Sequence, residues 1–162
     1  MMTADIEGLL AGSERAKKGM ELFEEGYNCS QSVFLAFADL YNMEESVALK
    51  LSSSFGGGMG RLREVCGAVS GMFMVAGVLY GYEDPKDHKL KSEHYARIQE
   101  LAAKFTEING SIVCRELLGL TEKKSEPVPE LRTAEYYKKR PCGQLVGIAA
   151  ALMEGYIKEH ED

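Results

Sequence analysis

The chain contains four cysteines, at Cys29, Cys66, Cys114 and Cys142, and each is expected in the first turn of a helix. They lie far apart, so no CxxC pair indicates a zinc or thioredoxin-type site, and no CxxCH motif indicates covalent haem. A thiol at a helix start faces the positive end of the helix dipole, which favours the thiolate. Four converging thiolates would ligate a metal, and two would be enough for a dithiol/disulfide couple.

Basic residues adjoin three of the cysteines. Arg61 and Arg63 precede Cys66, Arg115 follows Cys114, and residues 138–140 (Lys-Lys-Arg) precede Cys142. Nearby cations lower the pKa of a thiol, so this pattern predicts reactive or metal-ligating cysteines. The alternative is that all four are small buried hydrophobic residues, which is common for free cysteine. The residues alone leave both interpretations open.

A glycine-rich segment, residues 56–60 (Gly-Gly-Gly-Met-Gly), precedes Arg61 and leads toward Cys66. It is not a Walker A loop, because no Gly-Lys-Ser/Thr follows, and it does not match GxGxxG. Gly57, Gly58, Gly60 and Arg61 are candidate cofactor-binding residues, because closely approaching backbone amides bind anions or the sulfides of a cluster. Otherwise the segment is a flexible connection between two helices.

Apolar residues recur at helical spacing along the chain, and β-branched alternation is nearly absent, which predicts an all-α protein. With 162 residues and 45% hydrophobic content, we expect one domain, residues 1–162, with about six to eight helices around a central apolar helix at 65–81. Candidate caps and stops place helices at 13–25, 29–41, 42–55, 66–81, 85–108, 111–118, 133–139 and 142–158. The expected N-caps include Ser13, Asn28 (with Gln31 in a capping box), Asn42, Asp84 (followed by Pro85) and Ser111.

Residues 119–140 form a long loop or lid, interrupted only by the short helix expected at 133–139. The first part of this segment shows no helical periodicity and contains two prolines and charges of both signs. Loops of this length in a compact domain are usually functional lids or mobile connections.

Composition excludes several partners. The net charge of −6 argues against nucleic-acid binding, which needs a surplus of Lys and Arg.

The uncharged run 65–82 is diluted by four glycines and a serine, so it predicts a buried helix and no membrane span. The first eleven residues lack a secretory signal, so we expect a cytoplasmic protein in which permanent disulfides are disfavoured. A homodimer formed through the long charged helix expected at 85–108 stays an open alternative.

The order of these motifs resembles the C_GCAxxG_C_C family of redox-active proteins over roughly residues 16–153. The matching features are residues 28–33 (Asn-Cys-Ser-Gln-Ser-Val), the glycine segment, residues 66–71 (Cys-Gly-Ala-Val-Ser-Gly), Cys114-Arg115 and Cys142. The chain is also similar to the non-haem part of split-Soret cytochromes, whose haem-attachment motif it lacks.

The resemblance implies a small helical protein whose four cysteines are redox-active or hold a metal centre. On that basis Cys29, Cys66, Cys114 and Cys142 are predicted ligands of an iron–sulfur cluster or zinc. If no metal or other cofactor binds, Cys66 and Cys142 are the predicted redox thiols of a possible oxidoreductase or electron-transfer protein, with an unknown redox partner. The alternative is a helical small-anion-binding or protein-interaction module with incidental cysteines.

Overall fold

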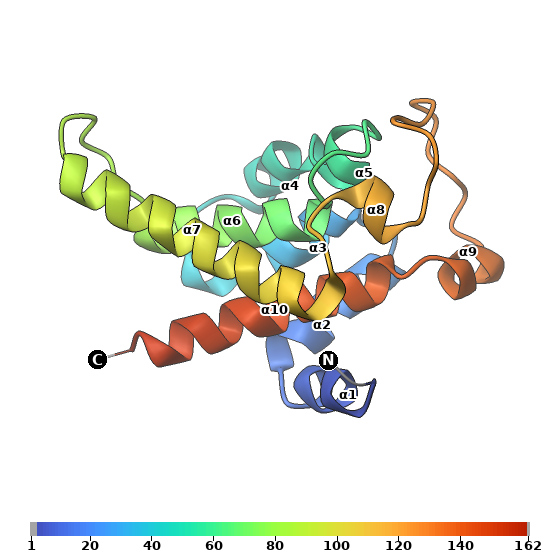
Figure 1. The fold of residues 1–162 in the computed structure, drawn as a ribbon, viewed down its shortest axis with the longest axis horizontal. Helices are drawn as coiled ribbons and strands as arrows, with labels where there is room; N and C mark the ends of the chain where they lie inside the picture. The colour runs from blue at the N-terminus through green and yellow to red at the C-terminus, as the bar shows by residue number, and fades with distance from the viewer. Residues whose placement is uncertain (1–2, 162) are drawn as a thin grey trace.

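The computed structural model describes residues 3–161, and this range is helical apart from loops and one isolated antiparallel bridge, Val65 to Val113 (Figure 1). The predicted all-α class is confirmed. The helices are α1 (Thr3–Ala11), α2 (Glu14–Glu24), α3 (Cys29–Leu35), the 3-10 turn η1 (Ala38–Leu40), α4 (Glu45–Ser53), α5 (Gly56–Met59), α6 (Gly67–Tyr80), α7 (His88–Asn109), α8 (Cys114–Leu117), α9 (Ala134–Lys139) and α10 (Cys142–Glu159).

Two of the predicted helix starts are confirmed in atomic detail. The side chain of Asn28 accepts a hydrogen bond from the backbone N–H of Gln31, and the Gln31 side chain accepts one from the N–H of Asn28, which completes the capping box of α3. Ser13 caps α2 by accepting a hydrogen bond from the N–H of Ala16. Both caps are short-range interactions, and for this reason they are readable in the sequence.

Other boundaries differ from the predictions. Helix α7 begins at His88 and not at Pro85, because the Asp84 carboxylate accepts a hydrogen bond from the N–H of Lys86 and closes a turn. Asp87 then caps the helix by accepting from the N–H of Leu90. Similarly, α4 has Glu44 and not Asn42 at its N-cap position. Helix α3 ends earlier than expected, at Leu35, and Ser111 precedes α8 without being its N-cap.

The core lies where α6 packs between α3 and α10, with α7 alongside. Figure 1 shows α7 and α10 running in opposite directions along the molecule, with α5, α8 and α9 gathered near the N-terminal end of α10. The predicted central helix is buried from Gly67 to Met72 and at Val75 and Ala76, whereas Val78 near its C-terminal end is 43% exposed.

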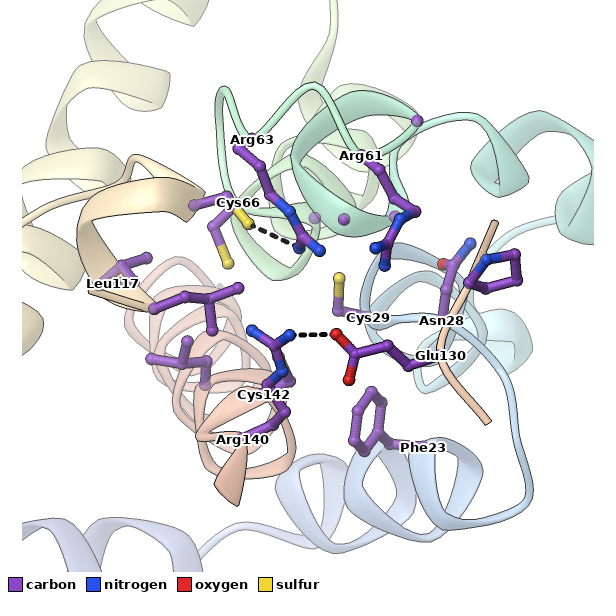
Figure 2. Close-up of a pocket in the computed structure, with 18 of the residues that line it drawn as sticks. Phe23, Asn28, Cys29, Arg61, Arg63, Cys66, Leu117, Glu130, Arg140 and Cys142 are labelled. Atoms are coloured by element: carbon purple, nitrogen blue, oxygen red, sulfur yellow. Dashed lines mark hydrogen bonds and ion pairs between the residues drawn. The ribbon is translucent and has the colours of Figure 1, made fainter. Parts of the chain in front are cut away.

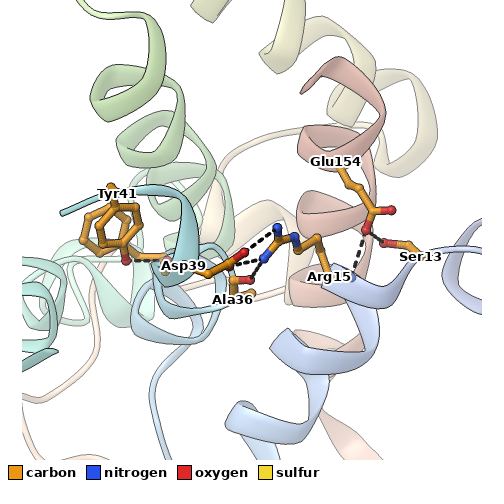
Figure 3. Close-up of polar contacts among 7 residues, drawn as sticks. Ser13, Arg15, Ala36, Asp39, Tyr41 and Glu154 are labelled. Atoms are coloured by element: carbon orange, nitrogen blue, oxygen red, sulfur yellow. Dashed lines mark hydrogen bonds and ion pairs between the residues drawn. The ribbon is translucent and has the colours of Figure 1, made fainter. Parts of the chain in front are cut away.

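Polar contacts join the N-terminal helices to this core (Figure 3). Glu154 of α10 accepts hydrogen bonds of 2.9 Å from the Ser13 hydroxyl and from the backbone N–H of Arg15. The Arg15 guanidinium in turn pairs with Asp39 and donates to the Ala36 carbonyl oxygen at 3.0 Å. These contacts fix α2 between α10 and the segment that follows α3.

Helices α3 and α6 approach each other closely at Gly71. A Cβ atom at Gly71 would lie 2.8 Å from the Ser30 carbonyl oxygen and 2.9 Å from Cβ of Val33. Both distances are shorter than normal van der Waals contact, so only glycine fits without displacing α3.

We therefore expect Gly71→Ala to lower the free energy of unfolding by about 1–3 kcal/mol, the usual cost of overpacking a core. The matched control is Gly77→Ala on the same helix, where an added Cβ has no neighbour within 4 Å. That control is expected to be neutral or stabilising, because alanine is the better helix former. Urea denaturation of both variants checks the prediction, and equal stabilities would contradict the packing account.

Candidate functional site

The structure brings the four cysteines to the walls of one cavity of about 260 Å³ (Figure 2). Cys29, Cys114 and Cys142 are the first residues of α3, α8 and α10, and Cys66 is the N-cap residue of α6. Each is thus at a helix start, as predicted. Cys142 is half-buried, the other three are buried, and all four thiols are free.

A short backbone pairing aligns Cys66 with Cys114. The N–H of Cys66 donates to the carbonyl oxygen of Ile112 at 2.7 Å, and the N–H of Cys114 donates to that of Glu64 at 2.6 Å. These bonds flank the isolated bridge and hold the starts of α6 and α8 together. This pairing was not predicted, because an isolated bridge leaves no strand pattern in the sequence.

Glycines make room for the thiols. A Cβ atom at Gly67, directly after Cys66, would lie 2.4 Å from Sγ of Cys29, and one at Gly58 would lie 2.6 Å from Cβ of Cys114. Neither position tolerates a side chain, because backbone atoms of Phe55 and of Arg63 would also lie 2.8 Å from the added Cβ atoms of Gly67 and Gly58 respectively. The Cys-Gly pair of the 66–71 motif thus lets a second cysteine approach the start of α6.

The glycine segment adopts an unusual backbone. Five consecutive residues, Gly57 to Arg61, have φ between 62° and 70°, so the chain turns in the left-handed sense there. Met59 and Arg61 carry side chains, as does Arg63 with φ of 61°, and each such residue costs about 1–2 kcal/mol in this region. The glycine segment, for which the sequence left an anion-binding loop or a flexible connection open, therefore forms a left-handed turn.

Three of the four predicted cofactor-binding residues line the cavity. These are Gly57, Gly60 and Arg61, whereas Gly58 is buried next to Cys114 and is not among the lining residues. Arg63, predicted only as a basic residue close to Cys66, is an additional residue of the cavity wall. Its side chain is 5% exposed, its Nη1 lies 3.6 Å from Sγ of Cys114, and its Nε donates to the Ser125 hydroxyl at 2.9 Å.

The segment 119–140 contributes to the wall through Pro127, Pro129, Glu130, Arg132 and Arg140, among others. It is held to the glycine turn, because the Arg61 Nε donates to the Glu126 carbonyl oxygen at 2.6 Å. Arg132 also lies 4.2 Å from the ring centroid of Phe23 and donates to the Phe23 carbonyl oxygen at 2.9 Å. An ion pair between Arg140 and Glu130 completes this side (Figure 2).

The prediction that cations lower the thiol pKa values is wrong for Cys66 and Cys142. Burial raises the pKa of Cys66 well above its usual value and raises that of Cys142 to about 12. Arg140 and Arg63 act in the opposite direction on the pKa of Cys142, but burial outweighs them. Burial also raises the pKa of Cys29, partly offset by the backbone N–H of Gly57. In the ligand-free pocket these three thiols are therefore protonated at neutral pH.

The donors surround a space and do not converge on a point. Among residues 3–161, no three Cys, His, Asp or Glu side chains lie close enough together to hold a single metal ion. None of the cavity-lining residues is a histidine, so the pocket offers no imidazole as base for a thiol.

A model of the family described as "Putative redox-active protein (C_GCAxxG_C_C)" matches residues 27–156, which include all four cysteines. The chain belongs to this family. The Cys-Gly-Ala-x-x-Gly core of its motif is the segment 66–71, where the structure shows why glycine follows Cys66 and why Gly71 ends the pattern against α3.

Two further comparisons give less information. The C_GCAxxG_C_C chain is 27% identical over 158 residues to an uncharacterized protein of Archaeoglobus fulgidus, covering 92% of this chain and 97% of that protein. No solved structure matches it.

Over the part of the chain that the structure describes, no helix has the length and apolar character needed to cross a membrane.

The raised thiol pKa values predict how stability depends on pH in the metal-free protein. The unfolded chain loses its thiol protons near pH 9, whereas folded Cys142 retains its proton up to about 12. The free energy of unfolding should therefore fall as the pH rises from about 9 to 12, by up to about 1.4 kcal/mol per pH unit for this thiol.

Tyrosines and lysines also titrate in this range, so the informative quantity is the difference between wild type and Cys142→Ser. The variant should show a shallower decrease, measured by urea denaturation at several pH values. Parallel curves for the two proteins would contradict the assignment.

Proposed function

We propose that this protein is an electron-transfer protein whose four cysteines hold an iron–sulfur cluster. The observation that carries the proposal is the convergence of Cys29, Cys66, Cys114 and Cys142, from four separate helix starts, on one cavity. Family membership supports a redox role and leaves the type of centre open.

The donor set and its spacing favour a cluster over a single ion. Four thiols are the ligands that iron–sulfur clusters and structural zinc both use. Around one zinc, with Zn–S bonds of about 2.3 Å, tetrahedral sulfurs would lie about 3.8 Å apart. The described residues contain no group of three donors placed to hold a single ion, and the cavity that the thiols line leaves room for a polynuclear centre.

The electrostatics of the thiols support a metal over a dithiol couple. Thiol–disulfide exchange requires a thiolate, and burial keeps Cys29, Cys66 and Cys142 protonated. A bound metal supplies the positive charge that makes ionised cysteines stable in such a site. Cys66 and Cys142, predicted as redox thiols, are thus assigned as ligands.

The surrounding residues have supporting roles in this proposal. When bound, an iron–sulfur cluster accepts and releases single electrons. Arg63 balances negative charge at Cys114, and the N–H of Gly57 does so at Cys29. The segment 119–140 acts as a lid that limits water at the thiols.

The test is the iron, zinc and acid-labile sulfide content of protein purified without oxygen, together with its visible spectrum. We expect iron and sulfide with visible absorption, and loss of both in Cys66→Ser and Cys114→Ser. Gly67→Ala should also lose the cluster although it removes no thiol, because its methyl group would lie 2.4 Å from Sγ of Cys29. Gly77→Ala on the same helix is the matched control and should retain it.

The other outcomes are distinct. Bound zinc in a colourless protein would contradict the cluster and support a mononuclear zinc site. Metal-free protein with reversible loss of titratable thiols on oxidation would contradict a metal centre and support a dithiol couple.

A further inference from the structure

The cavity is strongly positive although the protein is acidic. Its charged wall residues are four arginines and one glutamate, a net charge of +3 in a chain with a net charge of −6. The arginines are Arg61, Arg63, Arg132 and Arg140, and the glutamate is Glu130. Charge of one sign in a low-dielectric pocket attracts ligands of the opposite sign.

The four arginines differ in how their charge is balanced. Arg140 pairs with Glu130, and Arg132 donates to the carbonyl oxygens of Phe23 and Tyr27 while packing on aromatic rings. Arg61 and Arg63 have no carboxylate within 4 Å among the residues that the structure describes.

Arg63 is the more demanding of these two, because its side chain is 95% buried and always charged. A buried charge without a counter-charge is costly to keep in a folded protein. In the metal-free pocket its side-chain partners are the Ser125 hydroxyl and Sγ of Cys114, and neither is a carboxylate.

The side chains of Arg61 and Arg63 lie next to the same part of the pocket wall, at Gly57. A Cβ atom at Gly57 would contact both, at 2.9 Å from Cγ of Arg61 and 3.8 Å from Nη1 of Arg63. Figure 2 shows both guanidinium groups pointing into the space near Cys29, opposite Arg140 and Glu130. Burial and the charge of Arg63 lower the pKa of Arg61, although the more distant carboxylate of Glu130 acts in the opposite direction.

We propose that Arg61 and Arg63 form a binding site for a small oxyanion or carboxylate next to the cysteines. Guanidinium groups bind the oxygens of such anions in a bidentate geometry that a spherical anion cannot match. The inference goes beyond the proposed function and does not depend on it. Binding itself requires no metal.

The experiment is calorimetric titration of metal-free, reduced protein with sulfate, phosphate and acetate, using chloride as the spherical control at constant ionic strength. We expect at least one oxyanion or carboxylate to bind more tightly than chloride. The three probes separate an inorganic oxyanion from a carboxylate ligand. Arg61→Gln should weaken that binding about tenfold or more, the effect expected for losing one charge-assisted contact.

Two matched controls test whether the site is local. Glu130→Gln with Arg140→Gln removes the internal ion pair and leaves the pocket charge at +3, so binding should be retained. Arg15→Gln removes one positive charge outside this cavity and should also leave binding unchanged. If the buried Arg63→Gln variant fails to fold, Arg61→Gln still decides the question.

The proposal is overturned if no probe binds better than chloride, which would mean that the arginines only balance the charge of the thiolates or their centre. It is equally overturned if the Glu130/Arg140 double variant loses binding as Arg61→Gln does. Metal content is measured separately, so a protein that binds anions but no metal would contradict the proposed centre and leave the anion site standing.

Discussion

The close approach of α6 to α3 is the constraint on which the site depends. Gly67 and Gly71 remove the side chains that would otherwise keep the two helices apart, and Sγ of Cys29 occupies the space next to Gly67. With α3 and α6 in this contact, Cys29 and Cys66 share one cavity. The Val65–Val113 bridge adds Cys114, and the packing of α10 on α3 and α6 adds Cys142.

The same packing determines the chemistry of the thiols. Burial removes water from the cysteines and raises their pKa values, so the pocket without a cation contains protonated thiols. A bound metal reverses that preference, because it stabilises the thiolate directly. The strained turn at residues 57–61 places Arg61 in the wall of this pocket, and strain of this kind is typical of functional sites.

Much of the fold and part of the site were predictable from sequence. Ser13 and the Asn28–Gln31 capping box are local signals, and they correctly placed α2 and the start of α3. The predicted start of the last helix at Cys142 also matches α10, whereas α8 starts at Cys114 and not at the predicted cap Ser111. The C-terminal half of α6 is less buried than its uniform hydrophobicity indicated. Burial there depends on the neighbouring helices, which the sequence does not identify.

Tertiary contacts account for what the sequence could not provide. Arg63 donates to Ser125, which is 62 residues away, and the pairing at Val65 is an isolated bridge to Val113. Adjacent basic residues predicted lowered thiol pKa values, but Arg140 is neutralised by Glu130 and burial dominates at Cys142. Local charge pattern is therefore a poor guide to a buried site.

X-ray absorption at the iron edge of anaerobically purified protein tests the central claim most directly. The account predicts a first shell made only of sulfur and a second shell from a neighbouring iron, as expected when four thiolates hold a polynuclear centre. A first shell containing nitrogen or oxygen, a single isolated metal, or protein with no bound iron would contradict it.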